Sequence, residues 1–527
     1  MAPSRYENVL QQHLSRADFV VSVELVTPEA SEEFESAVAP AVELAERIKD
    51  DPRIHALALT DRVKSDDDHD PVRVAMRVAE ASGKGPIVHL AGKDRDRAWF
   101  LEALVRAEAA GLENLLLITG DMVKSAPQDR RVQYYDSVDM IADARGANAS
   151  FRLAAAVSPF KYREEELMNQ YLKMAKKERA DADWFITQIG WDMLKFKELA
   201  AYRRRRRLRA PVVAGLLLLT LARAHYIRTR RLAGITVSDQ LYARLQSEAS
   251  LPDKGVAAAY RRLALQIVGL KRLGFAGFQI SGMHRFDKVD RLLTQVEALE
   301  RELPTEADWW EAWWEALRGP DGQSVSPAPE RPFYLFRELE EPGGWKVPAD
   351  RLTPRELTGP TASGEEFRKF AALDRLDRVV FRPGSPGAVV FGPIARLVPP
   401  ASAFERGLRW VEQRVKGPIV GCETCGFCRL PYTMYVCPET CPKGLANGPC
   451  GGTSENACEF GDRECVHNRK YRVAKAAGRL QELETELIPP VPPARRGTCS
   501  WTNHFRGEDP AVLHLTEAGQ KEASHVH

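Results

Sequence analysis

Eight short, almost continuous apolar segments follow one another through the first 305 residues, and they constrain the fold more than any other feature. Continuous rather than alternating apolar runs are typical of parallel strands buried on both faces. Amphipathic stretches separate them, and the two clearest end in glycine, a common residue just beyond a helix. Eight strand–helix units in about 300 residues predict an α/β fold, a closed (β/α)₈ TIM barrel, with a doubly wound open sheet as the alternative. The segments are 19–25, 56–61, 86–92, 114–120, 151–157, 184–190, 211–219 and 275–281.

The C-terminal ends of these segments are where a (β/α)₈ barrel places its reactive groups. Glu24 lies there between two apolar neighbours, and a carboxyl group in such surroundings can keep its proton near neutral pH and act as a general acid. One glutamate and one aspartate among neutral hydrogen-bonding side chains suit a polar heterocyclic substrate. The residues at these ends are Glu24, Thr60, His89, Gly120, Asp121, Ser158, Gln188, Thr220 and the segment 281–284.

None of the nine cysteines precedes residue 422, and eight of them lie between residues 422 and 465. A secreted protein held by disulfides would spread its cysteines through the fold, whereas such a cluster in a reducing compartment is typical of a metal site. The opening spacing C-x2-C-x2-C resembles that of ferredoxins. The cluster therefore predicts an iron–sulfur centre ([4Fe-4S]) or, as two four-cysteine sites, zinc. The expected ligands are Cys422, Cys425, Cys428, Cys437, Cys441, Cys450, Cys458 and Cys465.

The chain beyond the barrel (residues 1–305) is predicted to form three further parts. Residues 306–332 comprise a tryptophan-rich helix, expected to dock the next domain, and a linker. Residues 333–487 form a C-terminal domain that contains the cysteine-rich module, preceded by strand-like runs and helices. Residues 488–527 are a Pro-rich tail, expected to be extended or disordered.

Charge and hydropathy exclude some classes of partner. Lys and Arg number 75 against 73 Asp and Glu, and a net charge of +2 argues against a general nucleic-acid binder. The arginine run 203–209 is expected to be a solvated segment. The longest apolar run, residues 210–219, is shorter than the roughly 20 residues of a membrane span, and the N-terminus lacks the apolar core of a signal peptide. We therefore expect a cytoplasmic protein without membrane contact.

Six segments of the barrel region resemble, in order, the methylenetetrahydrofolate reductase family, over about residues 15 to 303. The most specific are "ITGD" at residues 118–121 and "ITQ" at residues 186–188. The resemblance implies a (β/α)₈ barrel in which bound FAD passes hydride to 5,10-methylenetetrahydrofolate and forms 5-methyltetrahydrofolate. The other segments are 21–29, 89–97, 135–141 and 273–282.

The same resemblance implies roles for individual residues. Glu24 corresponds to the general acid that opens the imidazolidine ring of the folate. Asp121 would face both the flavin and the pterin, and Gln188 would hydrogen-bond the pterin. Ser158 and Tyr162 stand where better-known bacterial members have Tyr and His at the flavin, a departure that bears on FAD affinity. The positions implied to hold FAD, with the lysines near its phosphates, are Thr60, His89, Gly120, Asp121, Tyr135, Lys173, Lys176 and Lys177.

Residues 421–467 resemble the cysteine-rich domain that accompanies some of these reductases, fused or as a partner subunit. With an iron–sulfur cluster we expect electron relay to the flavin or docking of an electron-transfer protein; with zinc, a structural module and direct use of NADH or NADPH. The folate is the expected substrate, and the chain is a possible homo-oligomer. Two alternatives remain open: a folate-dependent methyltransferase or demethylase without redox chemistry, and a non-catalytic docking subunit of a methyl-transfer complex.

Overall fold

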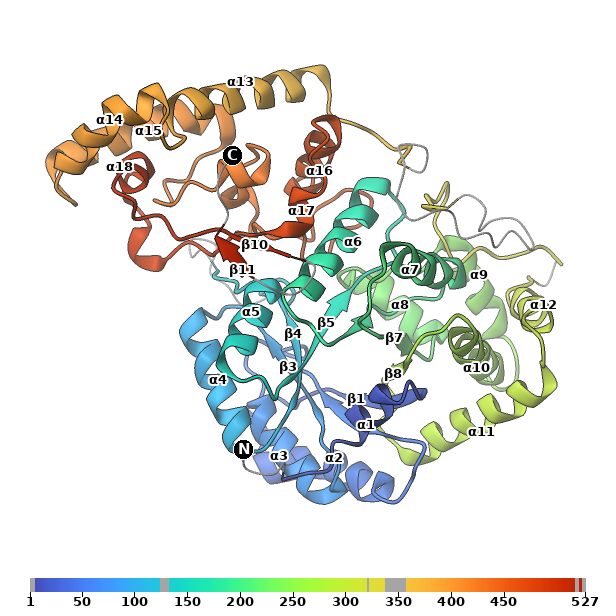
Figure 1. Cartoon of the computed structure of the whole chain (residues 1–527). Coiled ribbons are helices and arrows are strands. Elements are labelled where there is room, and N and C mark those ends of the chain that lie inside the picture. Colours follow the sequence, from blue (N-terminus) through green and yellow to red (C-terminus); the bar gives the residue numbers. More distant parts are fainter. Residues whose placement is uncertain (1–4, 124–131, 320–321, 337–356, 517–520, 524–527) are drawn as a thin grey trace.

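The eight predicted strands close into a parallel barrel in which β1 pairs with both β2 and β8 (Figure 1). The computed structural model describes residues 5–123, 132–319, 322–336, 357–516 and 521–523. The closed barrel confirms the predicted fold class and rejects the open sheet. Its strands are β1 (Val20–Leu25), β2 (Ala56–Leu59), β3 (Ile87–Ala91), β4 (Asn114–Ile118), β5 (Arg152–Val157), β6 (Trp184–Thr187), β7 (Val212–Leu217) and β8 (Gly277–Ser281).

Helices surround the barrel, and an aspartate begins several of them. The carboxylates of Asp70, Asp96, Asp136 and Asp192 each accept a hydrogen bond from a backbone N–H of the first turn, which satisfies a donor that has no partner inside the helix. These helices are α1 (Val9–Ser15), α2 (Phe34–Ile48), α3 (Pro71–Ser82), α4 (Arg97–Ala109), α5 (Ser137–Ala147), α6 (Glu164–Arg179), α7 (Met193–Arg206), α8 (Leu221–Arg230), α9 (Asp239–Glu248), α10 (Val256–Arg272) and α11 (Phe286–Glu302).

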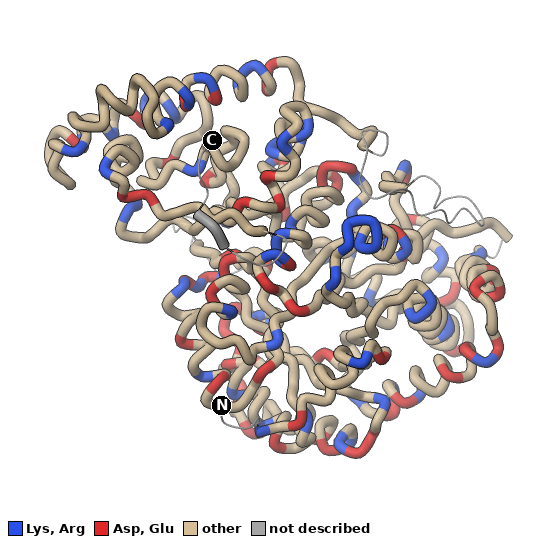
Figure 2. Tube along the Cα trace, viewed as in Figure 1, with Lys and Arg blue, Asp and Glu red and all other residues tan. Residues whose placement is uncertain are grey.

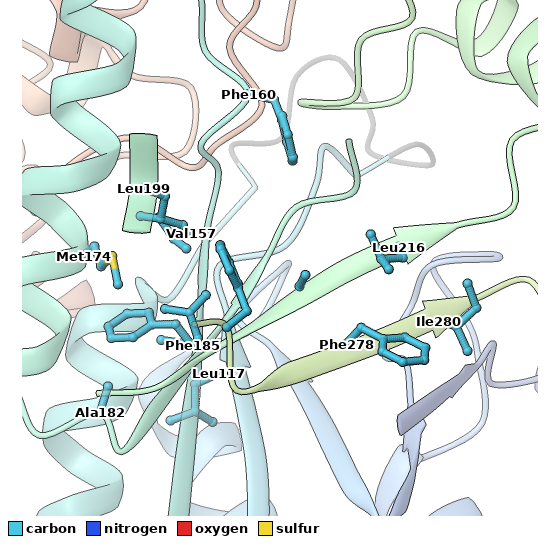
Figure 3. Packing of buried hydrophobic residues seen from close by; sticks show 14 of the residues in the cluster. Leu117, Val157, Phe160, Met174, Ala182, Phe185, Leu199, Leu216, Phe278 and Ile280 are labelled. Atoms are coloured by element: carbon cyan, nitrogen blue, oxygen red, sulfur yellow. The ribbon is translucent and has the colours of Figure 1, made fainter. Parts of the chain in front are cut away.

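Two apolar layers stabilise the barrel. The outer layer lies between strands and helices, where Figure 3 shows Phe185 near Met174 of α6. The inner layer fills the barrel, where Val20 and Ile87 pack together with Leu10 of α1. Because side chains alternate along a strand, residues two or four positions beyond the inner layer also face inward. This alternation brings Glu24 and His89 to the inside of the barrel, at the C-terminal ends of their strands.

The tryptophan-rich helix α12 (Glu306–Ala316) packs on α10 of the barrel, so its prediction as a helix docking the next domain is wrong in its target. The Trp309 indole donates a hydrogen bond of 2.7 Å to the Leu265 carbonyl. Its ring covers Gly269 so closely that a Cβ there would lie 2.0 Å from an indole carbon. The absence of a side chain at Gly269 therefore leaves the space that the Trp309 ring occupies.

The C-terminal domain is mainly helical where the sequence suggested strands. The runs at residues 378–383 and 388–393 belong largely to helices, and the tail is not disordered over the described residues 488–516, because Ile488, Val512 and Leu515 are buried. Its final strands form an antiparallel sheet in the order β11-β10-β9. The elements are α13 (Gly364–Val380), α14 (Pro386–Leu397), α15 (Ala403–Val420), η2 (Leu430–Thr433), η3 (Pro438–Thr440), α16 (Val466–Ala476), α17 (Glu482–Thr485), β9 (Glu486–Leu487), η4 (Pro493–Arg495), α18 (Ser500–Phe505), β10 (Leu513–Leu515) and β11 (Lys521–Ala523).

This domain packs on the barrel through α16 and α17, which contact α6 (Figure 1). Part of the arginine run 203–209 contributes to this interface, although the sequence predicted a solvated segment. Arg206 binds the Glu484 carboxylate with two hydrogen bonds of 2.8 and 2.9 Å, and Arg205 is buried. The cations at the end of α7 are visible in Figure 2. Among the described helices, none combines the length and apolarity needed to span a membrane.

Candidate active site and cysteine centres

The Glu24 carboxylate at the end of β1 is held by two side chains of β8. Gln279 Nε2 donates to Oε2 at 2.8 Å, and Ser281 Oγ donates to Oε1 at 2.7 Å. Burial raises the pKa of Glu24, and the two hydrogen bonds oppose this rise because they favour the ionised form. Glu24 is half-buried, and its raised pKa favours the protonated form that a general acid needs.

Neighbouring strand ends supply further polar groups. His89 on β3 is buried, which lowers its pKa to about 3, so the ring is neutral; no hydrogen-bond partner for its Nε2 exists among the described residues. Thr60 accepts a hydrogen bond from the Thr27 N–H at 3.1 Å. The Gln188 amide donates to the Ala233 carbonyl at 3.2 Å. His89 therefore presents an unused polar atom inside the barrel, whereas Thr60 and Gln188 already have protein partners.

A lysine of the C-terminal domain lies against the end of β4, beside the predicted Asp121. Lys443 Nζ donates to the Gly120 carbonyl at 2.8 Å and pairs with Glu459 at 2.5 Å. Burial opposes the charged form of Lys443, but the nearby Cys450, Glu459 and Asp121 outweigh it and raise the pKa. Asp121 itself is exposed. A fixed positive charge from the cysteine-rich segment is thus placed at the predicted folate position.

Lys173 on α6 is buried and bound to protein acceptors. Its Nζ lies 2.9 Å from Asp136 Oδ1 and donates to the carbonyl oxygens of Gly448 and Pro449, each at 3.1 Å. Gly448 has φ +117°, and a Cβ there would lie 2.9 Å from Lys173 Cδ. The loop of the cysteine-rich segment therefore packs directly on this side chain.

The other predicted FAD-binding residues of this region are also buried. Lys176 donates to the Glu486 carbonyl at 2.5 Å and Lys177 to the Ala156 carbonyl at 2.7 Å. Burial lowers the pKa of Lys176 to about 8 and that of Lys177 to about 7. The Tyr135 hydroxyl donates to Asp143 at 2.5 Å. Burial thus favours the neutral forms of both lysines.

A cavity of about 450 Å³ opens at the C-terminal ends of β7 and β8. Gly282, next to Ser281, is part of its wall, and the guanidinium of Arg223 hydrogen-bonds the Gly282 carbonyl. Arg291 covers the Tyr260 ring at 4.3 Å from the centroid. The wall carries three cations and one acid: Arg223, Lys288, Arg291 and Asp287. This balance suits an anionic ligand of moderate size.

The eight clustered cysteines separate into two sets of four. The first set surrounds a narrow cavity under α15, together with Lys416, whose Nζ lies 3.5 Å from Cys428 Sγ. Burial raises the pKa of Cys437 to about 12, and the thiols that raise it further are the other three of this set. The first set is Cys422, Cys425, Cys428 and Cys437.

The second set lies beside the barrel. Cys441 and Cys450 pack against Val123 and Tyr134, which flank the end of β4. Burial raises the pKa of Cys465, and the other thiols that raise it are those of this set alone. All nine cysteines are free thiols, and no three metal-binding side chains of the described residues converge on one ion position. The second set is Cys441, Cys450, Cys458 and Cys465.

Comparison with known proteins identifies the family. The model of "Methylenetetrahydrofolate reductase" matches residues 9–290, more than half of the chain. The chain belongs to the methylenetetrahydrofolate reductase family. A second model, "Methylene-tetrahydrofolate reductase C terminal", matches residues 402–492 and covers both cysteine sets. Membership in this family confirms the resemblance found in the sequence.

Individual proteins add little to this assignment. No curated protein matches the chain significantly. A solved structure of an uncharacterized protein from Clostridium thermocellum, described as binding two copies of 5-methyl-5,6,7,8-tetrahydrofolic acid, is 13% identical. The similarity covers 56% of this chain and 99% of that chain with a TM-score of 0.44, too low to support an argument.

The predicted FAD cradle of this reductase-family chain does not fit an FAD diphosphate at the three lysines. Their Nζ atoms already donate to protein acceptors, and the loop at Gly448 fills the space next to Lys173. The two departures agree with this finding. Tyr162 is turned to Asp192, 3.2 Å away, and the buried Ser158 hydroxyl has no partner among the described residues.

Sequence reasoning missed two residues of this site. Gln279, which holds Glu24, is the only polar side chain within the apolar stretch 275–280, and this signal was available. Lys443 gave no such signal, because its partner Gly120 lies 323 residues earlier in the chain. Contacts of this range depend on how the two domains pack.

Proposed function

We propose that this chain binds a reduced folate at the mouth of the barrel and reduces 5,10-methylenetetrahydrofolate to 5-methyltetrahydrofolate. The observation that carries the proposal is the Glu24 carboxyl group, half-buried at a strand end and held by Gln279 and Ser281. Membership in the family supports the same reaction. The chain would then act as an oxidoreductase.

In this proposal Glu24 supplies the proton that opens the folate ring. The methylene carbon of the substrate bridges N5 and N10, and protonation at N10 lets the carbon–N10 bond break. The bonding electrons stay on N10, and the carbon remains on N5 as an iminium cation. The iminium carbon then takes up two electrons and one proton and becomes the methyl group; NADH or NADPH would deliver them as hydride, and an electron-transfer protein would deliver two single electrons with the proton coming from solvent. Glu24 must be protonated for the first step, which its raised pKa favours.

The cationic cavity at the ends of β7 and β8 would hold the anionic end of the folate. Folates carry a glutamate tail with two carboxylates, and Arg223, Lys288 and Arg291 supply positive charge within this wall. Asp121 and Gln188 are proposed to bind the pterin. Both lie at strand ends, as the family position requires, although the Gln188 amide would have to exchange its Ala233 partner for the ligand.

Each set of four cysteines has the donors that an iron–sulfur cluster or a zinc ion requires. An iron–sulfur cluster would supply one-electron transfer, and the second set lies where such electrons would reach the barrel, beside β4. Zinc would supply only structural cross-linking. We propose iron–sulfur centres because the second set adjoins the candidate active site, a position that a purely structural clasp does not require.

The test is an anaerobic turnover experiment with the full-length protein. The protein is mixed with 5,10-methylenetetrahydrofolate and, in separate reactions, NADH, NADPH or dithionite-reduced viologen, and the products are separated by chromatography. Formation of 5-methyltetrahydrofolate with at least one donor is expected. Its absence with all three, while 5-methyltetrahydrofolate binds in calorimetry, would reject the redox reaction and retain the folate site.

That second outcome corresponds to a second candidate function, folate-dependent methyl transfer without redox chemistry. One observation favours it: the lysines expected to bind FAD are occupied by protein acceptors. A folate-binding chain that exchanges a methyl group with an acceptor, and that consumes no reductant, would support this alternative.

A further inference from the structure

The outer helices of the C-terminal domain carry most of the exposed large apolar side chains of the described residues. Thirteen of the nineteen lie within residues 367–419, on α13, α14 and α15. Figure 1 shows these helices along the edge of the domain that faces away from the barrel. Singly exposed apolar residues are normal on a protein surface, but a concentration of this kind marks an interaction site.

Helix α14 does not bury its large apolar side chains, as an amphipathic helix normally does. It buries its small residues Gly387, Gly392 and Ala395 and exposes its large ones. Val390, Ile394 and Leu397 follow the spacing of one helical face, and they are 58%, 53% and 83% exposed. Helix α14 packs on α18, and Gly387 lets it approach Val380 at the end of α13, but over the described part of the chain the large residues stay exposed. A soluble helix gains stability from such a face only when another surface covers it.

Helix α15 likewise buries polar side chains and exposes apolar ones. Its buried residues include two glutamates, Glu405 and Glu412, which are bound by partners on α18 such as the Ser500 N–H at 2.9 Å. Its exposed apolar residues form a stripe along the helix at intervals of three and four. The stripe, with the half-buried Leu408, consists of Phe404, Leu408, Val411, Val415 and Ile419. Such a stripe is typical of a helix–helix seam.

The area of this surface matches a stable interface. Aromatic side chains bury about 150–250 Å² each when fully enclosed, and aliphatic ones somewhat less. At roughly half exposure, the ten exposed side chains of α14 and α15 therefore present on the order of 800 Å². This exceeds the roughly 300–600 Å² of the largest patch on a typical monomer and reaches the roughly 800 Å² per partner of a standard interface. Transient electron-transfer encounters are smaller than this.

We propose that the exposed faces of α14 and α15 form the contact between two copies of this chain. Two copies placed face to face would bring α14 and α15 of one copy against the same helices of the other. The exposed face of α14 contains no carboxylate, so an identical face can meet it without requiring opposite charges. On α15, Arg406 lies two residues from Phe404, which places it on the far side of the helix from the stripe, in solvent.

The experiment compares the wild type with the double variant V390D/I394D by light scattering after size exclusion, over a wide range of protein concentration. The wild type is expected at twice the 59.0 kDa of one chain and the variant at the mass of one chain. Because both side chains are more than half exposed, the fold should survive the change, which circular dichroism checks. The matched control is V105D on α4, also 65% exposed, which should remain a dimer.

Three results would overturn the proposal: a single-chain mass for the wild type at all concentrations, a dimer that persists in V390D/I394D, or loss of the dimer in V105D. A single-chain wild type that instead co-sediments with phosphatidylglycerol-containing vesicles would assign the face to a lipid surface. As a second measurement, hydrogen exchange of α14 and α15 in the wild type should accelerate on dilution. Exchange that is independent of concentration would also reject the dimer.

Discussion

Replacing Glu24 by glutamine removes the proposed acid and keeps the shape of the site. The amide has nearly the same shape as the carboxyl group, and its oxygen can accept the hydrogen bond that Gln279 now gives to Oε2 at 2.8 Å. The new NH₂ group then faces Ser281, whose hydroxyl can turn to accept, because a hydroxyl is both donor and acceptor. The change should therefore cost no more than about 1 kcal/mol of stability.

Its effect on turnover should be much larger. A positioned proton donor typically contributes about 10²–10⁴ in rate, which corresponds to roughly 3–5 kcal/mol in the activation barrier. We expect E24Q to reduce 5,10-methylenetetrahydrofolate about 10²–10⁴ times more slowly than the wild type, with the affinity for 5-methyltetrahydrofolate changed only slightly. Single-turnover kinetics and calorimetry measure the two quantities separately.

The dependence of the turnover rate on pH tests whether Glu24 acts in its protonated form. Because Glu24 acts in its protonated form, the wild-type rate should be constant below the raised pKa of Glu24 and fall as the pH rises through it. The S281A variant is the matched control, since it keeps the acid but removes a hydrogen bond that lowers this pKa. Its rate should fall at higher pH than that of the wild type. A turnover of E24Q within threefold of the wild type, or the same descending limb in both, would refute the role of Glu24.

Three further changes test the packing and the cysteine centres. Lys173→Met should cost about 3–5 kcal/mol, because Asp136 would remain buried without its cation, and a lowered thermal midpoint of the full chain measures this. Trp309→Ala should cost about 3–5 kcal/mol through the cavity left over α10, and an unchanged urea midpoint would contradict the packing described for α12. Cys437→Ser and Cys465→Ser should each remove about half of the bound iron or zinc, since they belong to different sets; loss of all metal in either would show a single centre.

The fold of the barrel could be predicted from the sequence because each strand is a local apolar run, and eight of them in regular succession leave few topologies. Glu24 could be predicted for the same reason, since its place at a strand end follows from the run that precedes it. Helix α14 could not, because "AVVF" is typical of a strand when only its large residues are considered. The structure instead buries the small residues Gly387, Gly392 and Ala395, and a Cβ at Gly387 would lie 2.5 Å from Val380 Cα, so this glycine lets α14 approach the end of α13.

The contacts between the two domains also could not be predicted from the sequence. A lysine near an expected phosphate has the same local pattern whether it binds that phosphate or a carbonyl of another domain. Lys176 finds its acceptor, the Glu486 carbonyl, 310 residues later in the chain. Only the packed structure distinguishes these cases, and it shows that the lysines implied by family resemblance for FAD have protein acceptors.

The buried lysines on the barrel side of the interface also set an order for the synthesis of the chain. Lys161 and Lys173 leave the ribosome about 275 to 290 residues before the carbonyls that will bind them, those of Gly448 and Gly451. At roughly 5–20 residues per second, the nascent barrel waits on the order of 15–60 s for these acceptors. During that interval the side chains of Lys161 and Lys173 must be hydrated, so water must still have access to the side of the barrel at α6. The barrel is thus completed only near the end of translation, by the segment that also carries the cysteines.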